Sequence, residues 1–464
     1  DGNTTTDGIT NAGNFSTDSG TIKLDGNYPT GTDNVALGDT ALDTVEAGGT
    51  NNTAIGNHAG TAITTGDYNT ALGSLSLESN TTAGNNTAIG GAALRCNTTG
   101  CENTSVGSGS MASNTEGDNN VAVGRFALSG NTTADSNTAV GHCSLKANTT
   151  GTLNTAVGVC SSYAMTTGQQ NISMGGNSLL ANTTGSRNSA LGQSSLSSNV
   201  SGVDNVAVGH GALSSNTSDN NVGVGRASLQ ANVGGNLNTA VGAFSSRCNT
   251  TGLQNVSVGA CSNHGSTTAC YTVAIGEKTF LATNTGNGNT TVGQSSMRCN
   301  TSGANNTNIG RNGLCANISG SSNTAIGSDS LKSNTTASSN TAVGYYSLRA
   351  NTTGCQNTAT GVNSMLCNTD GVCNTAMGVS ALRCNLSGDN NVAFGYQTLY
   401  KNTSSNNTGL GHCSLFANQS GGGNVAVGSF TADAVTTGSN NTALGFESAG
   451  KLTTGGDNVA VGRA

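Results

Sequence analysis

Cysteines are the residues of this chain whose spacing could support covalent chemistry. The 464-residue sequence holds 14 of them, and some recur at a fixed interval, as Cys143 and Cys160 do. Cys96 and Cys101 instead flank a turn-like Asn-Thr-Thr-Gly segment. If the interval places two cysteines on stacked strands, their Cα atoms lie ~4.8 Å apart, within the range that a disulfide spans. The cysteines for which the sequence predicts pairing are Cys96, Cys101, Cys143, Cys160, Cys299, Cys315, Cys367 and Cys384.

Disulfides would indicate an oxidising, extracellular setting, whereas free thiols would fit a protein made in a reducing cytoplasm. A metal site is not expected, because Cys96 and Cys101 lack the spacing of paired metal ligands and no Cys-x-x-Cys pair accompanies them. His142 precedes Cys143, but adjacent strand residues point to opposite faces, so a nucleophilic Cys–His pair is not expected either. Paired carboxylates, phosphate-binding loops and dinucleotide fingerprints are also absent from the sequence. We therefore expect no enzyme activity, no catalytic or metal-binding residue and no cofactor.

Asparagine carries the second candidate chemistry, because Asn-x-Ser/Thr sequons recur along the chain. In a secreted eukaryotic protein such sequons would accept N-linked glycans. The alternative is structural, since Asn-Thr-Thr-Gly is also turn chemistry. The sequons that we single out are Asn80, Asn97, Asn131, Asn148, Asn182, Asn199, Asn249, Asn300, Asn334 and Asn351.

A repeat of about 17 residues must position all of these groups. Its core reads Asn-Thr-Ala-Val-Gly, as at residues 137–141 and 154–158, and its closing glycine recurs in 26 copies from Gly38 to Gly462. One step is of 18 residues, from Gly38 to Gly56, and two are of 16. A period this short and regular predicts a solenoid in which each repeat contacts mainly its neighbours.

Composition agrees with a repeat architecture rather than with globular domains. Charged residues make up 8% of the chain and aromatic residues 3%, with 69 glycines and a net charge of -7. This balance gives no basic footprint for nucleic acid. No run approaches the ~18 apolar residues of a membrane span, so membrane insertion is not expected.

Numbering the repeat from its Asn, position 2 is Thr or Val, 3 is small, 4 is apolar, 5 is Gly, 9 is mostly Leu, and 12–15 often read Asn-Thr-Thr-Gly. We expect two short strands per coil, at positions 1–4 and 7–10, joined at corners by glycine and Asn-rich turns. The sequence thus predicts an all-β fold, a parallel β-solenoid of about 26 coils over residues 34–464, preceded by an irregular capping segment at residues 1–33. Such a stack would be on the order of 120 Å long.

Ladders of like side chains follow from this stacking. Val or Ile at position 4 and Leu at position 9 should form apolar ladders, and Asn at positions 1 and 12 amide ladders. The small residue at position 3 predicts a second face against which something packs closely, hence a homo-oligomer. The alternative is that Ala and Ser fit a narrow coil interior.

The Asn-[Thr/Val]-Ala-[Val/Ile/Leu]-Gly repeat resembles the parallel β-roll of YadA-like trimeric adhesin heads. It is also similar to repeat arrays in tail-fibre proteins of marine bacteriophages and other large viruses, including the lead-in at residues 22–38. The first resemblance implies left-handed coils and a homotrimer. The second implies a fibre on a virion surface.

These features favour a non-enzymatic structural fibre protein, a rigid shaft on a virion or cell surface that displays or spaces an attachment tip. One alternative is a glycosylated, disulfide-stapled extracellular filament whose subunits join end to end. Another is an adhesin surface for a glycan receptor, with Tyr345, Tyr346, Tyr396, Tyr400, Phe126 and Phe446 as stacking contacts. Ice binding through threonine ladders at positions 2, 13 and 14 is a remote third.

Overall fold

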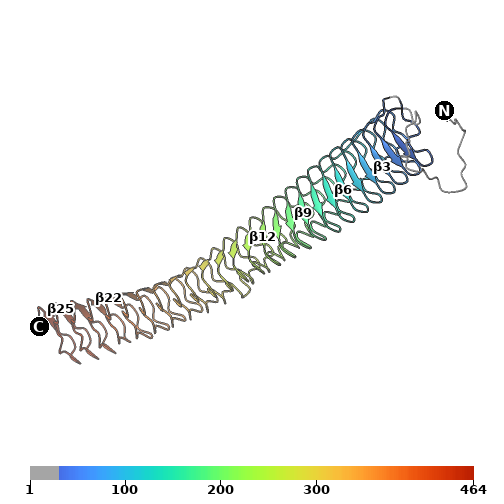
Figure 1. Cartoon of the computed structure of the whole chain (residues 1–464). Helices are drawn as coiled ribbons and strands as arrows, with labels where there is room; N and C mark the ends of the chain where they lie inside the picture. The colour runs from blue at the N-terminus through green and yellow to red at the C-terminus, as the bar shows by residue number, and fades with distance from the viewer. Residues whose placement is uncertain (1–30, 47, 464) are drawn as a thin grey trace, which may run out of the picture. The chain divides into compact units, whose positions relative to one another are not determined.

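The computed structural model describes residues 31–46 and 48–463, so most of the expected capping segment lies outside the described residues. The described residues form 26 strands of three residues each and no helix. The chain divides into two compact units, Asp1–His142 and Cys143–Ala464. In each unit the strands stack in sequence order along one side of the coils (Figure 1).

The first unit contains β1 Val35–Leu37, β2 Thr53–Ile55, β3 Thr70–Leu72, β4 Thr87–Ile89, β5 Thr104–Val106, β6 Val121–Val123 and β7 Thr138–Val140. The second unit contains β8 Thr155–Val157, β9 Ile172–Met174, β10 Ser189–Leu191, β11 Val206–Val208, β12 Val222–Val224, β13 Thr239–Val241, β14 Val256–Val258, β15 Val273–Ile275, β16 Thr290–Val292, β17 Thr307–Ile309, β18 Thr324–Ile326, β19 Thr341–Val343, β20 Thr358–Thr360, β21 Thr375–Met377, β22 Val392–Phe394, β23 Thr408–Leu410, β24 Val425–Val427, β25 Thr442–Leu444 and β26 Val459–Val461.

Strand pairing within each unit is parallel and in register with the repeat. In β19 and β20, for example, Thr341 lies beside Thr358 and Val343 beside Thr360. The N–H of Thr341 donates to the carbonyl of Asn357 at 2.8 Å, and the N–H of Gly361 donates to the carbonyl of Val343 at 2.7 Å. One strand of each coil therefore pairs with the same strand of the next, which confirms the all-β parallel solenoid.

The second strand expected in each coil, at positions 7–10, is a turn instead. Positions 7 and 9 have positive φ, 60° at Tyr346 and 48° at Leu348. The N–H of Tyr346 donates back to Ser328 of the preceding coil at 3.2 Å, whereas that of Leu348 donates forward to Ser364 at 3.0 Å. Residues with left-handed backbone conformation at positions 7 and 9 thus donate hydrogen bonds to the preceding and the following coil. Small and apolar residues alternate in this segment as they do in a strand, and Leu rarely adopts a positive φ, so the sequence suggested a strand here.

The interior of the coil takes position 3, not position 4. In β18, Ala325 is fully buried whereas Ile326 is 37% exposed and points outward. Leu at position 9 does fill the core, as predicted, and Leu348 is fully buried. The apolar ladder expected at position 4 forms on the outside of the coil, with Ile309 beside Ile326, and the idea that the small face packs against something outside was wrong. The alternative, that small residues fit a narrow interior, is confirmed.

Two exchanges show how narrow that interior is. Thr398 replaces the usual small residue at position 8, and Gly409 then replaces Ala at position 3 of the next strand; a Cβ on Gly409 would lie 2.6 Å from Cγ2 of Thr398. Conversely, Asn308 occupies position 3, and Gly313 at position 8 leaves the space that its amide fills. Positions 3 and 8 therefore share one small volume, as expected for close-packed interiors.

Positions 9 and 12 share a second volume. Where Ser162 replaces Leu at position 9, Met165 replaces Asn at position 12 and is fully buried. Ala432 and Val435 make the same exchange, also buried. In these two coils apolar volume is conserved although its position along the chain moves, whereas Ser246 replaces Leu with Asn249 still at position 12.

Amide ladders at positions 1 and 12 occur as predicted. At position 1, the backbone N–H of Asn188 donates to Oδ1 of Asn171 at 3.0 Å, and its Nδ2 donates to the carbonyl of Gly202 at 2.8 Å. At position 12, Nδ2 of Asn317 donates to Oδ1 of Asn300 at 2.8 Å and to the carbonyl of Gly320 at 2.9 Å. These bonds satisfy corner groups that are cut off from water.

Glycine at position 5 gives the first test, because it has both a positive φ and a close backbone neighbour. Gly175 has φ 131°, and a Cβ there would lie 2.7 Å from the carbonyl carbon of Gly192. We expect Gly175→Ala to lower the thermal unfolding midpoint clearly, at a cost of about 1–3 kcal/mol. The matched control is Gly176→Ala next to it, where the nearest atom is 3.9 Å away and φ is not positive. Equal unfolding midpoints for the two variants, measured by circular dichroism, would contradict this reading.

Asn263 gives the second test. It replaces Leu at position 9, is fully buried, and neither Nδ2 nor Oδ1 has a hydrogen-bond partner. We expect Asn263→Leu to stabilise the protein by about 1–3 kcal/mol, since it removes an unpaired amide from the core. Asn300→Leu is the control, because its Nδ2 donates to Asn284 and Gly303 and its substitution should destabilise. Chemical denaturation of the two variants should give shifts of opposite sign.

Candidate functional site

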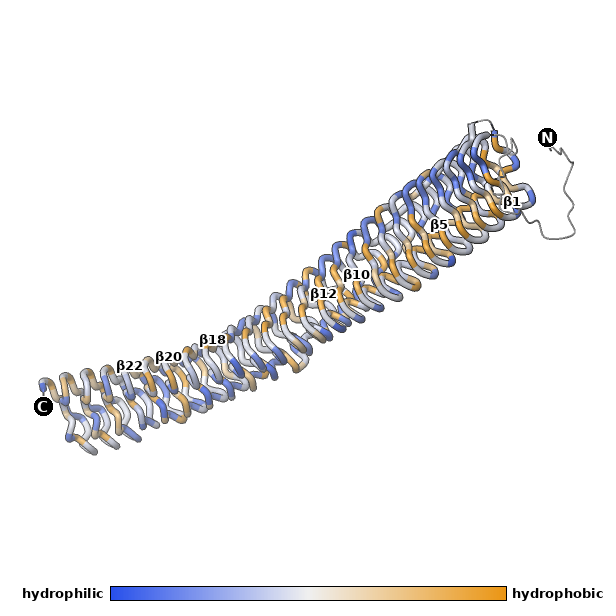
Figure 2. The backbone as a smooth tube through the Cα atoms, viewed as in Figure 1, coloured by the Kyte–Doolittle hydropathy of each residue, from blue (hydrophilic) through white to orange (hydrophobic). Residues whose placement is uncertain are grey.

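The outward face of the strands is the first candidate surface. None of the 26 strands contains a charged residue. Position 4 is exposed to 46% at Ile309, 43% at Phe394 and 38% at Leu410. Hydrophobic segments recur from coil to coil along each unit (Figure 2). In each unit the strands therefore present an uncharged surface made mostly of Thr, Val, Ile and Leu side chains.

An aromatic row crosses the last coils at positions 6 and 7. The rings of Tyr396 and His412 stack with centroids 5.2 Å apart, and His412 meets Phe430 edge-on at 4.9 Å. Phe446 follows at 6.3 Å from Phe430, and Arg463 lies over its ring at 5.4 Å. Of the predicted stacking residues, Tyr396 and Phe446 belong to this row. His412 and Phe430 were missed, although all of them share positions 6 and 7 of the repeat.

The other predicted aromatics have separate partners. Tyr345 and Tyr346 stack on each other with centroids 3.8 Å apart, and Arg349 lies over Tyr346 at 4.7 Å. Tyr400 stacks on Phe416 at 5.2 Å. Phe126, in the first unit, has Arg125 over its ring at 4.5 Å. The six residues therefore do not form one binding platform.

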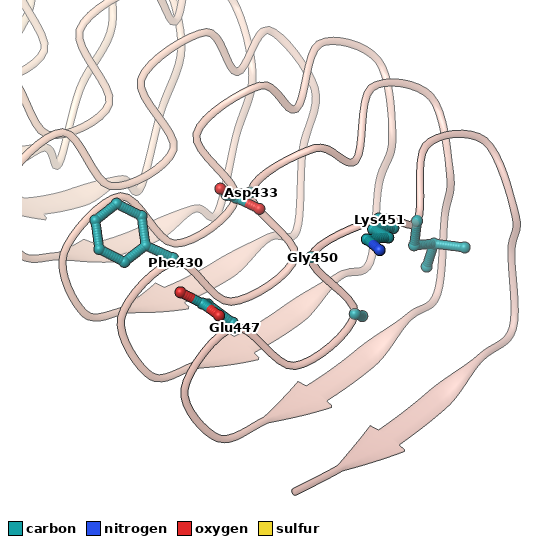
Figure 3. A pocket seen from close by; sticks show the side chains of 7 residues that line it. Phe430, Asp433, Glu447, Gly450 and Lys451 are labelled. Carbon is teal, nitrogen blue, oxygen red and sulfur yellow. The ribbon is translucent and has the colours of Figure 1, made fainter. Parts of the chain in front are cut away.

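A cavity of about 580 Å³ lies between the segment that follows β24 and the segment that follows β25. Phe430, Asp433, Glu447 and Lys451 line it (Figure 3). Burial raises the pKa of Asp433, and the nearby Glu447 carboxylate raises it further, although backbone N–H groups oppose both effects. Two carboxylates, a cation and an aromatic ring are the groups that bind polar ligands such as sugars.

The structure carries all 14 cysteines as free thiols. Four of the cysteines for which we expect pairing lie on adjacent coils, Cys299 next to Cys315 and Cys367 next to Cys384. The backbone N–H of Cys299 donates to the carbonyl of Cys315 at 3.1 Å, and burial raises the pKa of Cys315, with a further contribution from Cys299. Burial likewise raises the pKa of Cys384, with a contribution from Cys367. Raised thiol pKa values disfavour the reactive thiolate. Disulfide formation at these pairs remains a prediction.

Cys143 and Cys160 share position 7, where both have positive φ, 55° and 53°. Cys143 is buried and Cys160 is partly exposed. Cys96 and Cys101, which flank one corner, each contact a different group. The Cys96 thiol lies 4.0 Å from Nη2 of Arg95, and the Cys101 thiol donates to the carbonyl of Thr99 at 3.4 Å. The pairing of either set remains a prediction.

Cysteine at position 16 has a structural explanation that the sequence did not reveal. The backbone N–H of Ser338 donates to Sγ of Cys355 at 3.3 Å, and the N–H of Leu253 donates to Sγ of Cys270 at 3.3 Å. Asp occupies the same position elsewhere, and Oδ1 of Asp118 accepts from the N–H of Cys101 at 2.6 Å. Position 16 is therefore a row of hydrogen-bond acceptors between coils, in which sulfur replaces oxygen.

The sequon asparagines lie inside the coil. The ten that we singled out are at most 1% exposed. In Asn97, Nδ2 donates to Oδ1 of Asn80 at 2.9 Å and to the carbonyl of Gly100 at 2.8 Å. A glycan on such a nitrogen would have to break both bonds and leave the interior. The turn chemistry of position 12 accounts for these asparagines without glycosylation. The sequons in question are Asn80, Asn97, Asn131, Asn148, Asn182, Asn199, Asn249, Asn300, Asn334 and Asn351.

In the part of the chain that the structure describes, no three His, Cys, Asp or Glu side chains lie close enough to hold a metal ion. The same residues contain no helix of the length and hydropathy needed to cross a membrane. Comparison with protein-family models gives no match, and comparison with curated proteins gives none either.

The cavity gives the third test through Asp433. A carboxyl whose pKa is raised on folding stabilises the fold at low pH and loses that contribution as the pH rises through its folded value. We therefore expect Asp433→Asn to raise the unfolding midpoint at pH 7 and to leave it nearly unchanged at pH 3. Asp204 is the control of opposite sign, because its hydrogen bond with Arg187 lowers its pKa. Asp204→Asn should lower the midpoint slightly at pH 7 and not at pH 3; a fall at pH 7 for Asp433→Asn would contradict the assignment.

Proposed function

We propose that this chain is a non-enzymatic structural protein, the shaft of a fibre on a virion or cell surface that spaces or displays an attachment tip. The observation that supports it is the continuity of hydrogen bonding between coils in the second unit. Strand, turn and corner each bond to the neighbouring coil, as Thr358, Met365 and Thr369 do. A coil bonded around its whole circumference resists bending and shear at every step, which is what a spacer needs.

The outward sheet face supports self-association as part of this proposal. A second copy of the chain is the partner that fits, because only the same repeat matches its ~4.8 Å spacing over many coils. Apolar side chains at position 4 of both copies would then interlock, as rows do between stacked sheets. A homo-oligomer, a trimer among them, would cover this face, and end-to-end contact would extend the fibre.

The glycan-receptor alternative is favoured by one observation, the cavity beside the aromatic row, where Phe430, Asp433 and Glu447 meet. The filament alternative would draw on cysteine pairs such as Cys299 and Cys315. Ice binding has less support, because position 13 threonines are engaged between coils. The hydroxyl of Thr98 donates to the carbonyl of Thr115 at 3.0 Å, so position 13 offers no free hydroxyl row.

The test combines small-angle X-ray scattering with light scattering on the full chain. If the chain is a shaft, the X-ray scattering curve should be that of an elongated particle. If the chain self-associates, light scattering should give a mass that is a multiple of 45.5 kDa. A compact, globular scattering curve would refute the shaft.

The face itself is tested by Ile309→Glu combined with Ile326→Lys, which places charge on two exposed positions of the sheet. We expect this variant to fall to the monomer mass and to keep its circular dichroism spectrum. The control Leu153→Glu with Leu237→Lys changes residues that are 55% and 53% exposed at position 17, outside the strands, and should keep the oligomer. A monomeric wild-type chain, or an oligomer unaffected by the sheet variant, would remove the sheet face from the proposal.

A further inference from the structure

Side chains at position 10 of the second unit form a row in which adjacent coils contact each other. Nε of Arg247 donates to Oε1 of Gln230 at 2.9 Å. Nη1 of Arg383 donates to the hydroxyl of Tyr400 at 2.6 Å, and Tyr400 stacks on Phe416. Side chains at position 10 of successive coils therefore lie next to one another and form a continuous row along the stack.

Positive charge gathers on this row. Arg298, Lys332, Arg349 and Arg383 occupy position 10, and Lys401 follows Tyr400 at position 11. We call these five residues the basic edge. From Gln230 to Phe416, position 10 carries no Asp or Glu. A chain of net charge -7 with 16 Lys and Arg residues therefore places four of its cations in one row and a fifth next to it.

Successive charges of the basic edge lie one or two coils apart, because Cys315 and Leu366 occupy position 10 in two of the coils between them. Six coil steps separate the coil of Arg298, which begins after β16, from that of Lys401, which begins after β22. At ~4.8 Å a step the basic edge is about 29 Å long, and neighbouring charges are about 5 or about 10 Å apart. A flexible linear polymer with several anionic groups along its length is the ligand that can meet all five charges at once.

Most of this charge is available to a ligand. Among the described residues only Lys332 of the five takes part in an ion pair, with Asp329 at 2.9 Å. Arg298, Arg349 and Lys401 are exposed. Three of the five are arginines, whose planar guanidinium binds sulfate or carboxylate groups through two N–H donors.

The rings beside the basic edge distinguish between kinds of polyanion. Arg349 covers Tyr346, Arg383 lies 5.5 Å from the ring of Tyr400, and Lys401 lies 5.7 Å from that of Phe416. Tyr400 and Phe416 also stack on each other. Because these faces are occupied, they offer no platform for nucleobases, whose stacking provides much of the affinity for single-stranded nucleic acid. A sulfated sugar chain needs only the charges and the donors.

We propose that the basic edge binds a linear sulfated polysaccharide along the side of the solenoid. The binding is electrostatic, follows the stack over several coils and leaves the outward sheet face free. This inference rests on the row itself and does not depend on the shaft proposal.

The experiment measures binding of fluorescein-labelled dextran sulfate to the full chain by fluorescence anisotropy, at several salt concentrations. We expect Arg349→Gln combined with Arg383→Gln to weaken binding at low salt at least about tenfold. We also expect it to reduce the slope of log Kd against log salt by about two, one for each lost cation contact. The matched control is Arg125→Gln with Arg311→Gln, which removes the same charge at position 6; it should bind nearly as tightly as the wild type.

The variants are compared only after circular dichroism shows the wild-type unfolding midpoint, and Arg349→Lys with Arg383→Lys provides a second test that keeps the charge. We expect the lysine variant to restore the salt slope and part of the affinity. Equal affinity of the glutamine variant and the wild type, or equal losses in variant and control, would overturn the proposal. Equally tight binding of a 20-nucleotide oligothymidylate would overturn the choice of polysaccharide.

Discussion

Hydrogen bonding of each coil to the next is the interaction on which the rest of this structure depends. The strand, the turn and the corner each contribute backbone hydrogen bonds to a neighbouring coil, and the Asn rows at positions 1 and 12 add side-chain bonds. This arrangement works only if successive coils have the same outline. Glycine at position 5 shows how strict the requirement is, since a Cβ on Gly175 would strike the backbone of Gly192.

A fixed outline also fixes the volume inside. In several coils the sequence exchanges a large and a small side chain between two positions that share one interior volume. Met165 compensates for Ser162, and Gly409 compensates for Thr398. Asn263 departs from this rule and leaves an unpaired amide in the core. Stability in such a stack is a sum over coils and their interfaces, so a local departure costs stability locally and leaves the remaining coils in place.

What the stack does not constrain is the outside of each coil, and the candidate functions lie there. Positions 6, 7, 10 and 11 vary in charge and aromatic character, yet whatever they carry is repeated in line by the stacking. The aromatic row through Tyr396 and Phe446 and the basic edge through Arg349 and Arg383 are two results of this alignment. The uncharged sheet face is a third, because every strand turns position 4 outward.

The sequence by itself determined the period, the parallel stacking, the position 9 core and the amide ladders, because each depends on residue types that recur at one spacing. Only the tertiary structure decided which way each residue faces. Apolar Ile326 points outward and small Ala325 inward because the coil is too thin for two bulky layers. The second expected strand is a turn, because residues such as Leu348 have a positive φ and direct their N–H groups to the following coil. The same closure buried the sequon asparagines and brought the position 10 cations into line, because side chains 17 residues apart become neighbours only when the coils stack.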